Sequence, residues 1–147
     1  MMSIRMQLIP AFFVLGLIFS ATPALADRTL SAGDQSAIRA VIQSQLAAFQ
    51  IDDANTAYGH ASTAIQLRFG SPAEFMSMVR THYRPVYRPA AYQFLDLAVE
   101  SGGIFQPVAI TTQSGDTVIA LYRMEKDETG RWRIAGCRLI DPPGAGA

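Results

Sequence analysis

The side chains best suited to chemistry are few in this sequence: it holds one cysteine, Cys137, and two histidines, His60 and His82. A protein zinc site needs three or four ligands, usually in closely spaced pairs, and these residues form no such pair. A single cysteine makes no disulfide within its own chain, so Cys137 is a reactive thiol, one half of an intermolecular bridge, or a small apolar residue beside Gly136. We expect the third of these roles, and structural roles for both histidines.

Tyrosine and arginine side chains, with one of the histidines, gather at expected helix ends and in the segment that follows the helices. Tyrosine offers an apolar ring with a hydrogen-bonding tip, and arginine offers a fork that suits a carboxylate or a phosphate. The alternative is structural, with rings packed flat on a sheet and guanidinium groups in water. We expect any ligand to lie near them, between the first long helix and the concave face of the sheet. The candidate ligand-binding residues are Tyr58, His60, Arg68, Tyr83, Tyr87 and Arg88.

No motif of a familiar catalytic chemistry is present. The sequence has no glycine-rich phosphate loop, nucleophile elbow, metal motif or dinucleotide fingerprint. We therefore expect no cofactor and no metal, and no catalytic residue is assigned. The 12 basic residues balance 12 acidic ones, which argues against nucleic acid as a partner, because that binding depends on clustered Lys and Arg at the phosphates.

The first 26 residues have the composition of a cleavable signal peptide. Arg5 provides a positive start, residues 8–20 are almost continuously apolar, Pro23 interrupts the run, and residues 24–26 read Ala-Leu-Ala. Signal peptidase recognises small residues at the first and third of these last positions. The apolar run is shorter than the roughly 20 residues of a membrane span, so we expect no stable membrane anchor; the alternative is an uncleaved one. The mature protein is expected in the periplasm or secreted.

Helix signals dominate the first half of the mature chain. Ser31, followed three residues later by Asp34, indicates a capped helix start, and apolar residues then recur every three or four positions as far as Phe49. This pattern predicts an amphipathic helix of about five turns. Shorter helices are expected over residues 53–58 and 61–69, the latter capped by Ser62 and stopped by Gly70, and after Ser71, Pro72 and Glu74, which occupy capping-box positions.

The hydrophobic period changes from about 3.6 to 2 after Pro89. Residues 84–89 contain two prolines and are expected as an extended linker. The later segments predict an α+β domain over residues 27–140, with the N-terminal helices packed on a curved four-stranded antiparallel sheet, and a disordered tail over 141–147. The four strands are predicted over residues 92–99, 104–113, 117–125 and 131–140.

Stretches spread over nearly the whole mature chain form one pattern: residues 38–49, 57–58, 61–62, 68–72, 75–76, 78–79, 83, 85–89, 120–122 and 130–137. In these stretches the sequence resembles the bacterial domain of unknown function 4864 family, within the nuclear transport factor 2-like superfamily. The resemblance implies a cone of helices and a curved sheet. It implies no activity, because the family has none assigned and the superfamily includes isomerases, dehydratases and pure binding or dimerisation modules.

Two functions follow from these observations. The first is an exported module that binds a small, partly apolar ligand or a protein partner, a second copy in a homodimer included, without catalysis. The alternative is a cofactor-free lyase or isomerase acting in the cone cavity, which needs a buried carboxylate beside a tyrosine. Asp52 and Asp53 are better explained as helix caps, and Asp96 and Glu100 form no paired-carboxylate motif. We therefore favour binding.

Export is testable at the N-terminus of the mature protein. We expect cleavage after Ala26, so that the isolated protein begins at Asp27 and fractionates as a soluble exported protein. N-terminal sequencing combined with cell fractionation measures both properties. A chain that begins at Met1 and is recovered from the membrane fraction would contradict this prediction.

Overall fold

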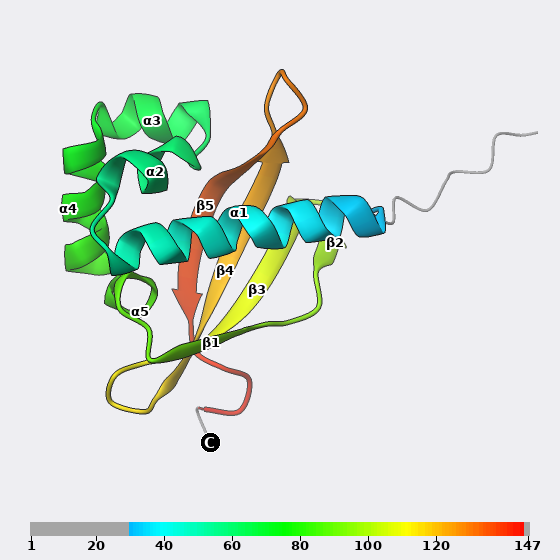
Figure 1. Cartoon of the computed structure of the whole chain (residues 1–147). Coiled ribbons are helices and arrows are strands. Elements are labelled where there is room, and N and C mark those ends of the chain that lie inside the picture. The colour runs from blue at the N-terminus through cyan, green and yellow to red at the C-terminus, as the bar shows by residue number, and fades with distance from the viewer. Residues whose placement is uncertain (1–29, 146–147) are drawn as a thin grey trace, which may run out of the picture.

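The structure, a computed structural model, describes residues 30–145 (Figure 1). The expected signal peptide, residues 1–26, lies outside the described residues. Within the described part the chain forms helices first and strands afterwards. The helices are α1 (Ala32–Gln50), α2 (Ala54–Gly59), α3 (Thr63–Phe69), α4 (Pro72–His82) and α5 (Arg84–Tyr87), and the strands are β1 (Ala91–Phe94), β2 (Ala98–Glu100), β3 (Gly103–Thr111), β4 (Thr117–Lys126) and β5 (Trp132–Ile140).

Side-chain caps begin four of these helices at the predicted positions. Ser31, Asp53, Ser62 and Ser71 each accept a hydrogen bond from the backbone N–H three residues further on. Gly70 ends α3 with a φ of 75°, a left-handed conformation that glycine adopts without a Cβ clash. The predicted starts of α1 to α4 are therefore confirmed.

The strands form one open antiparallel sheet in the order β1-β3-β4-β5, and β2 also pairs with β3. The predicted α+β class is confirmed, but the predicted number of four strands is wrong, because segment 92–99 contributes two short strands. Phe94 pairs with Val108, whereas Ala98 pairs with Phe105. The interruption between β1 and β2 therefore lies opposite the middle of β3.

Pro107 explains this interruption. Proline has no N–H, so at this position β3 offers no backbone donor to the carbonyl of Leu95. The Leu95 N–H still donates to the Pro107 carbonyl over 3.0 Å. The side chain of Gln106 replaces the missing donor, with its Nε2 lying 2.8 Å from the Leu95 carbonyl oxygen. The segment stays attached to the sheet while the regular ladder breaks.

Residues 84–89 also differ from the prediction of an extended linker. Arg84–Tyr87 form the single helical turn α5, in which the N–H groups of Tyr87 and Arg88 donate to the carbonyls of Tyr83 and Arg84. Pro85 lies in the first turn, where a helix needs no donor from it. The prediction was wrong because it treated proline as incompatible with any helical turn.

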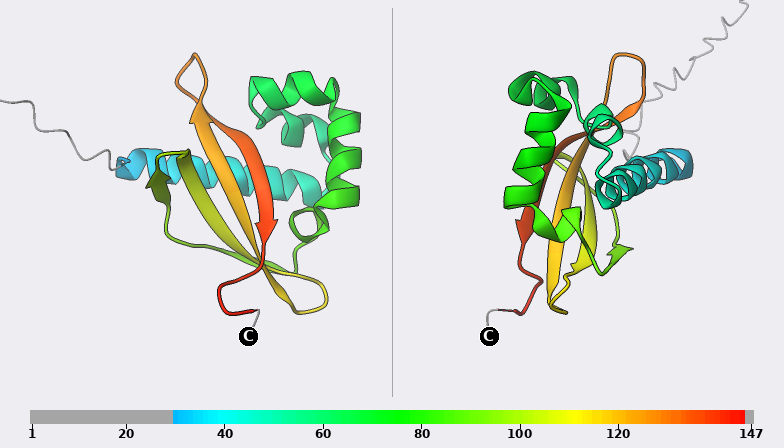
Figure 2. Two further views of the ribbon diagram at one scale, coloured as in Figure 1. Left: turned by 180° about the vertical axis from the view of Figure 1, so that it is seen from behind. Right: turned by 60° about the vertical axis from the view of Figure 1, so that its left-hand side comes forward.

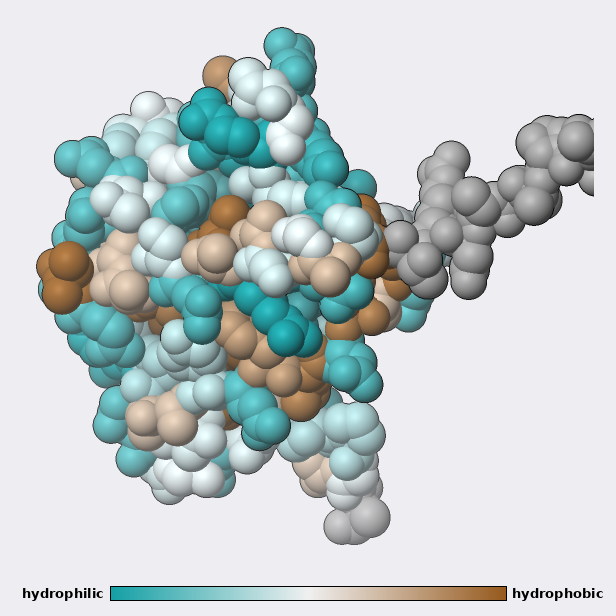
Figure 3. Space-filling view, turned by 45° about the vertical axis from the view of Figure 1, so that its right-hand side comes forward, coloured by the Kyte–Doolittle hydropathy of each residue, from teal (hydrophilic) through white to brown (hydrophobic). Residues whose placement is uncertain are grey.

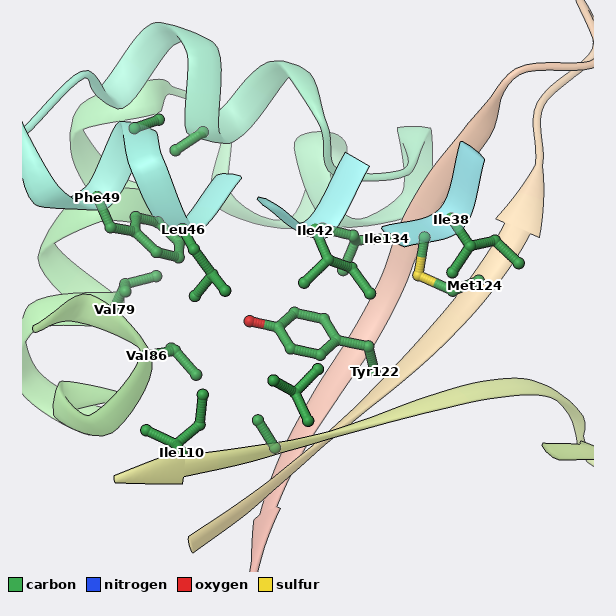
Figure 4. Close-up of a cluster of buried hydrophobic side chains, with 14 of the residues drawn as sticks. Ile38, Ile42, Leu46, Phe49, Val79, Val86, Ile110, Tyr122, Met124 and Ile134 are labelled. Atoms are coloured by element: carbon green, nitrogen blue, oxygen red, sulfur yellow. The ribbon is translucent and has the colours of Figure 1, made fainter. Parts of the chain in front are cut away.

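Helix α1 lies across one face of the sheet and supplies one side of the core (Figures 1 and 4). The shorter helices α2 to α5 gather at the C-terminal end of α1, on the side of β5 (Figure 2). All core residues of α1 and the sheet named next are at most 3 % exposed. The α1 side chains are Ile38, Ile42, Leu46 and Phe49, and those of the sheet are Val108, Ile110, Ala120, Tyr122 and Met124.

The surface beside α1 is mixed in character. Hydrophobic residues reach this surface between α1 and the neighbouring strands, among polar residues (Figure 3). Tyr92 of β1 and Val99 of β2 are 40 % and 47 % exposed.

In residues 30–145 no helix combines the length and apolarity needed to cross a membrane.

A polar contact fastens the start of α1 to the β4–β5 hairpin. Trp132 Nε1 donates to Asp34 Oδ1 over 3.0 Å, and Lys126 Nζ lies 2.9 Å from the same oxygen. Hydrogen bonds from Lys126, Ser31 and Trp132 lower the pKa of Asp34 from its usual 3.8 to about 2. The ionised form of the Asp34 carboxylate is thus the form that holds the start of α1 against the β4–β5 hairpin.

The Asp34 contact is expected to depend on pH. Because folding depresses this pKa, the contribution of Asp34 to stability is complete above about pH 3.8 and is lost as the pH falls through about 2. We expect Asp34→Asn to be less stable than the wild type at neutral pH, and the difference to shrink across this window. Urea unfolding followed by the fluorescence of Trp132, the only tryptophan, measures it. Asp96→Asn, at an exposed position, is the control, and a pH-independent difference would contradict the prediction.

Candidate functional site

A cavity of about 530 Å³ lies between the helices and the edge strand β5. Residues of α1, α3, α4 and α5 line it on one side, and residues of β4 and β5 line it on the other. The exposed side chains of Arg68 and His82 belong to the lining and mark its mouth. Its size is within the roughly 300–1,000 Å³ of known small-molecule pockets.

The wall of the cavity is mainly apolar. In this wall, the Phe75 ring of α4 lies at centroid distances of 6.3 and 5.8 Å from the rings of Phe49 and Phe69. None of the described residues that line the cavity is Asp or Glu. The large apolar side chains of the wall are Phe49, Ile65, Phe69, Phe75, Met78, Val79, Val86 and Ile134.

Tyr122 of β4 forms the inner part of the wall. It is 1 % exposed, and its hydroxyl has no hydrogen-bond partner in the described part of the chain. Figure 4 shows the hydroxyl directed toward the side where Val79 and Val86 lie, and both of these residues line the cavity. Burial raises the pKa of Tyr122 well above its usual value of 10. The hydroxyl therefore stays protonated and has a proton to donate.

The helices are attached to the outer edge of β5 at two places. The Ile134 N–H donates to the His60 carbonyl over 2.9 Å, and the Ser62 N–H donates to the Ile134 carbonyl over 2.8 Å. Further along, the Tyr83 hydroxyl donates to the Cys137 carbonyl over 3.1 Å. Between the two attachments the pairing of β5 with β4 shifts register. The irregular stretch of β5 lines the cavity.

Cys137 belongs to this wall and is paired in register with Tyr122. Burial raises the pKa of its thiol to about 12. A thiol with so high a pKa is protonated at neutral pH and is a poor nucleophile. Its surroundings support the expected role as a small apolar residue.

The mouth of the cavity carries two nitrogen-bearing side chains. Arg68 lies in the last turn of α3, and His82 lies in the last turn of α4. The Arg68 guanidinium lies 5.7 Å from the centroid of the Phe69 ring. No acidic residue among those described forms a salt bridge with Arg68. The mouth thus presents positive charge that an anionic group could contact.

Two of the six predicted ligand-binding residues, Arg68 and Tyr83, line the cavity. Tyr58 and His60 instead connect helices. The Tyr58 hydroxyl donates to the carbonyl of Gln66, and His60 Nε2 lies 2.7 Å from the hydroxyl oxygen of Ser44. Burial, with a smaller effect of the nearby Arg133, lowers the pKa of His60. Both side chains therefore make contacts within the protein and lie outside the cavity wall.

Tyr87 and Arg88 belong to a separate polar cluster around Asp52, whose φ is 55° in the turn after α1. Arg80 and Arg88 lie 3.1 and 3.0 Å from the Asp52 carboxylate, and the Tyr87 hydroxyl also donates to it. Hydrogen bonds from Tyr87 and then Arg80 lower the pKa of Asp52. The cluster fastens the α1–α2 turn to α4 and α5, so these side chains do not share one site with Arg68 and Tyr83.

A comparison with known families covers this whole arrangement. A family model described as Domain of unknown function (DUF4864) matches residues 31–147, which include every residue of the cavity wall. The chain belongs to the DUF4864 family. The family predicted from the sequence is thus confirmed. No match was found among curated proteins or among solved structures.

Sequence reasoning missed most of the wall of this DUF4864 cavity, including Tyr122 and Gln45. Tyr122 alternates with Ala120 and Met124 along β4, a period of two that marks an inward-facing position. Gln45 lies inside the apolar stripe of α1, where its Nε2 donates to the carbonyl of Ala57 over 3.0 Å. In both cases a residue with a polar group stands at a position where the hydrophobic period of the strand or helix calls for an apolar side chain.

The carboxylates considered for catalysis lie outside the wall of the DUF4864 cavity. Asp53 caps α2, as predicted, whereas the expectation that Asp52 is also a cap was wrong, because its carboxylate binds Arg80 in the polar cluster. Asp96 and Glu100 are exposed. In residues 30–145 no three His, Cys, Asp or Glu side chains come together as a group that could hold a metal ion.

The thiol of Cys137 provides a test of this wall. With the pKa raised from 9.0 to about 12, the thiolate fraction at mildly alkaline pH should fall about a hundredfold or more. We expect Ellman's reagent to label the folded DUF4864 protein at least that much more slowly than the urea-unfolded protein. The labelling rate of the folded protein should rise with pH beyond the range where an ordinary thiol is fully ionised. Rapid labelling of the folded protein at neutral pH would contradict the prediction.

Proposed function

We propose that this DUF4864 protein binds a small, partly apolar molecule in the cavity between its helices and β5, without converting it chemically. The observation that carries the proposal is the cavity of about 530 Å³ with its mainly apolar wall. An apolar ligand body placed there leaves water and gains roughly 25 cal/mol for each Å² of surface buried. The rings around Phe75 provide much of the surface that such a body would contact.

The mouth supports a ligand with an anionic end. Arg68 and His82 both line the cavity and are exposed, so a carboxylate or phosphate placed there can contact them while the rest of the ligand lies deeper. Exposed charge pairs contribute modestly and are weakened by salt. The charged end therefore sets the orientation of the ligand, and most of the affinity comes from the apolar wall.

The composition of the wall favours binding over chemistry. A cofactor-free lyase or isomerase places a carboxylate or a histidine against the reacting atom as its base. The described lining residues include no Asp or Glu, Cys137 holds its proton at neutral pH, and His82 lies at the exposed mouth. The alternative of a lyase or isomerase therefore has less support than binding.

We further propose that the protein acts outside the cytoplasm and that its fold is the nuclear transport factor 2-like cone. The composition of residues 1–26 supports export. Helices that precede an antiparallel meander, with a cavity walled by both, support the cone.

Binding is testable with 8-anilinonaphthalene-1-sulfonate, an apolar fluorophore with one anionic group. We expect the folded protein to bind it and to enhance its fluorescence. Cys137→Phe inserts a ring into the cavity from β5 and should remove most of this binding. Arg68→Gln should weaken binding by about two- to fivefold, the effect of losing an exposed charge pair. Arg123→Gln, an exposed arginine outside the wall, should leave binding unchanged.

The near-ultraviolet circular dichroism of each variant shows whether it is folded. Met78→Trp fills the same cavity from α4 and serves as a second test if Cys137→Phe does not fold. Dye binding that persists unchanged in a folded cavity-filling variant would place the dye elsewhere and contradict the proposal.

A further inference from the structure

Three polar side chains of the cavity wall are buried or half-buried, and two of them are engaged by the protein. Gln45 Nε2 donates to the carbonyl of Ala57 over 3.0 Å. The Tyr83 hydroxyl donates to the carbonyl of Cys137 over 3.1 Å. The third is Tyr122, whose fully buried hydroxyl has no partner among the described residues. This one donor of the inner wall is left for something that enters the cavity.

An unpaired phenol at this buried position reduces the stability of the fold. Buried polar groups in folded proteins are almost always hydrogen-bonded, and an unmet donor loses its bonds to water without replacement. Phenylalanine would supply the same ring without that loss. The hydroxyl lies on the side of Val79 and Val86, in the direction of the cavity (Figure 4). Its position indicates a role in recognition rather than in packing.

We propose that the ligand carries an uncharged hydrogen-bond acceptor, such as a carbonyl or ether oxygen, which receives the proton of Tyr122 at the inner end of the cavity. This inference rests on the proposed function and adds a chemical class to it. The ligand is an apolar molecule with a neutral oxygen acceptor at the inner end and an anionic group at the mouth.

Two physical arguments select a neutral acceptor for the inner end. The phenol has one proton to donate, since burial keeps it un-ionised, and that proton needs an acceptor. A carboxylate at this depth would be desolvated beside a single neutral donor, because Arg68, the cationic side chain of the lining, is exposed at the mouth. A charged group is therefore stable at the mouth and a neutral oxygen at the inner end.

The experiment compares two probes of nearly equal size, acetophenone and ethylbenzene, which differ in the carbonyl oxygen. Binding to the full mature protein and to Tyr122→Phe is followed by ¹⁵N–¹H NMR titration. The carbonyl stretching band of bound acetophenone, labelled with ¹³C, is recorded by infrared difference spectroscopy. Tyr92→Phe removes a hydroxyl from a 40 % exposed tyrosine outside the cavity and is the matched control.

We expect the wild type to bind acetophenone about fivefold more tightly than ethylbenzene, the effect of one net hydrogen bond. Tyr122→Phe should lose this preference, and Tyr92→Phe should keep it. The carbonyl band should lie at lower frequency in the wild type than in Tyr122→Phe, where the hydrogen bond is gone. A merely structural role for the hydroxyl would leave this band unmoved.

Different failures separate this inference from the proposed function. If both probes bind the wild type equally and the band does not move in Tyr122→Phe, the cavity binds apolar molecules but the role of Tyr122 is overturned. If neither probe binds and the naphthalene sulfonate dye does not bind either, the proposed function fails and this inference fails with it. If Tyr122→Phe does not fold, the carbonyl band of acetophenone bound to the wild type is compared with the band of acetophenone in heptane. A lower frequency in the protein supports the inference, and an equal frequency overturns it.

Discussion

The way the helices attach to the outer edge of β5 determines where the cavity lies. The edge of a sheet presents backbone N–H and C=O groups that other elements can bind. Here the segment between α2 and α3 exchanges two backbone hydrogen bonds with Ile134, and Tyr83 binds the carbonyl of Cys137 three residues later. The helices are therefore held beside β5 at separate points rather than by a continuous ladder. The irregular part of β5 between these points borders the cavity instead of a packed helix.

The rest of the interior explains why such a space can persist. Under α1, Ile38 and Ile42 are fully buried and belong to one core cluster with residues of β3 and β4 such as Val108 and Tyr122. Voids cost stability in proportion to their size, because the groups around them lose contacts. In the wall of the cavity, the rings of Phe49 and Phe69 each pack against Phe75. The charged cluster around Asp52 reinforces the same end of the molecule from outside.

Structural features that depend on residues close together in the sequence, such as helix caps, were predictable. Features that depend on contacts between distant parts of the chain were not. The caps Ser62 and Ser71 act on N–H groups three residues away, so their helices were predicted correctly. The break between β1 and β2 depends on Pro107 and Gln106 of the neighbouring strand β3, and no pattern within residues 92–99 reveals it. Tyr83 and Tyr87 both lie at helix ends, yet one lines the cavity and the other binds Asp52. Position at a helix end identified the type of residue suited to a site, but the fold decides which hydroxyl is already engaged.

Two buried polar residues in the middle of the sheet differ in whether the backbone uses their donor groups. Gln106 and Tyr122 are paired in register on β3 and β4, and both are buried. The Gln106 amide nitrogen serves the backbone, because it donates to the carbonyls of Leu95 and Pro107 where proline leaves a donor missing; its Oε1 has no partner among the described residues. The pairing of β3 with β4 continues through Tyr122 without a shift of register, so no backbone group there needs the phenol. Under the proposed function, the Tyr122 phenol is the donor that a bound molecule would use, because the residue lines the cavity and its hydroxyl has no partner among the described residues.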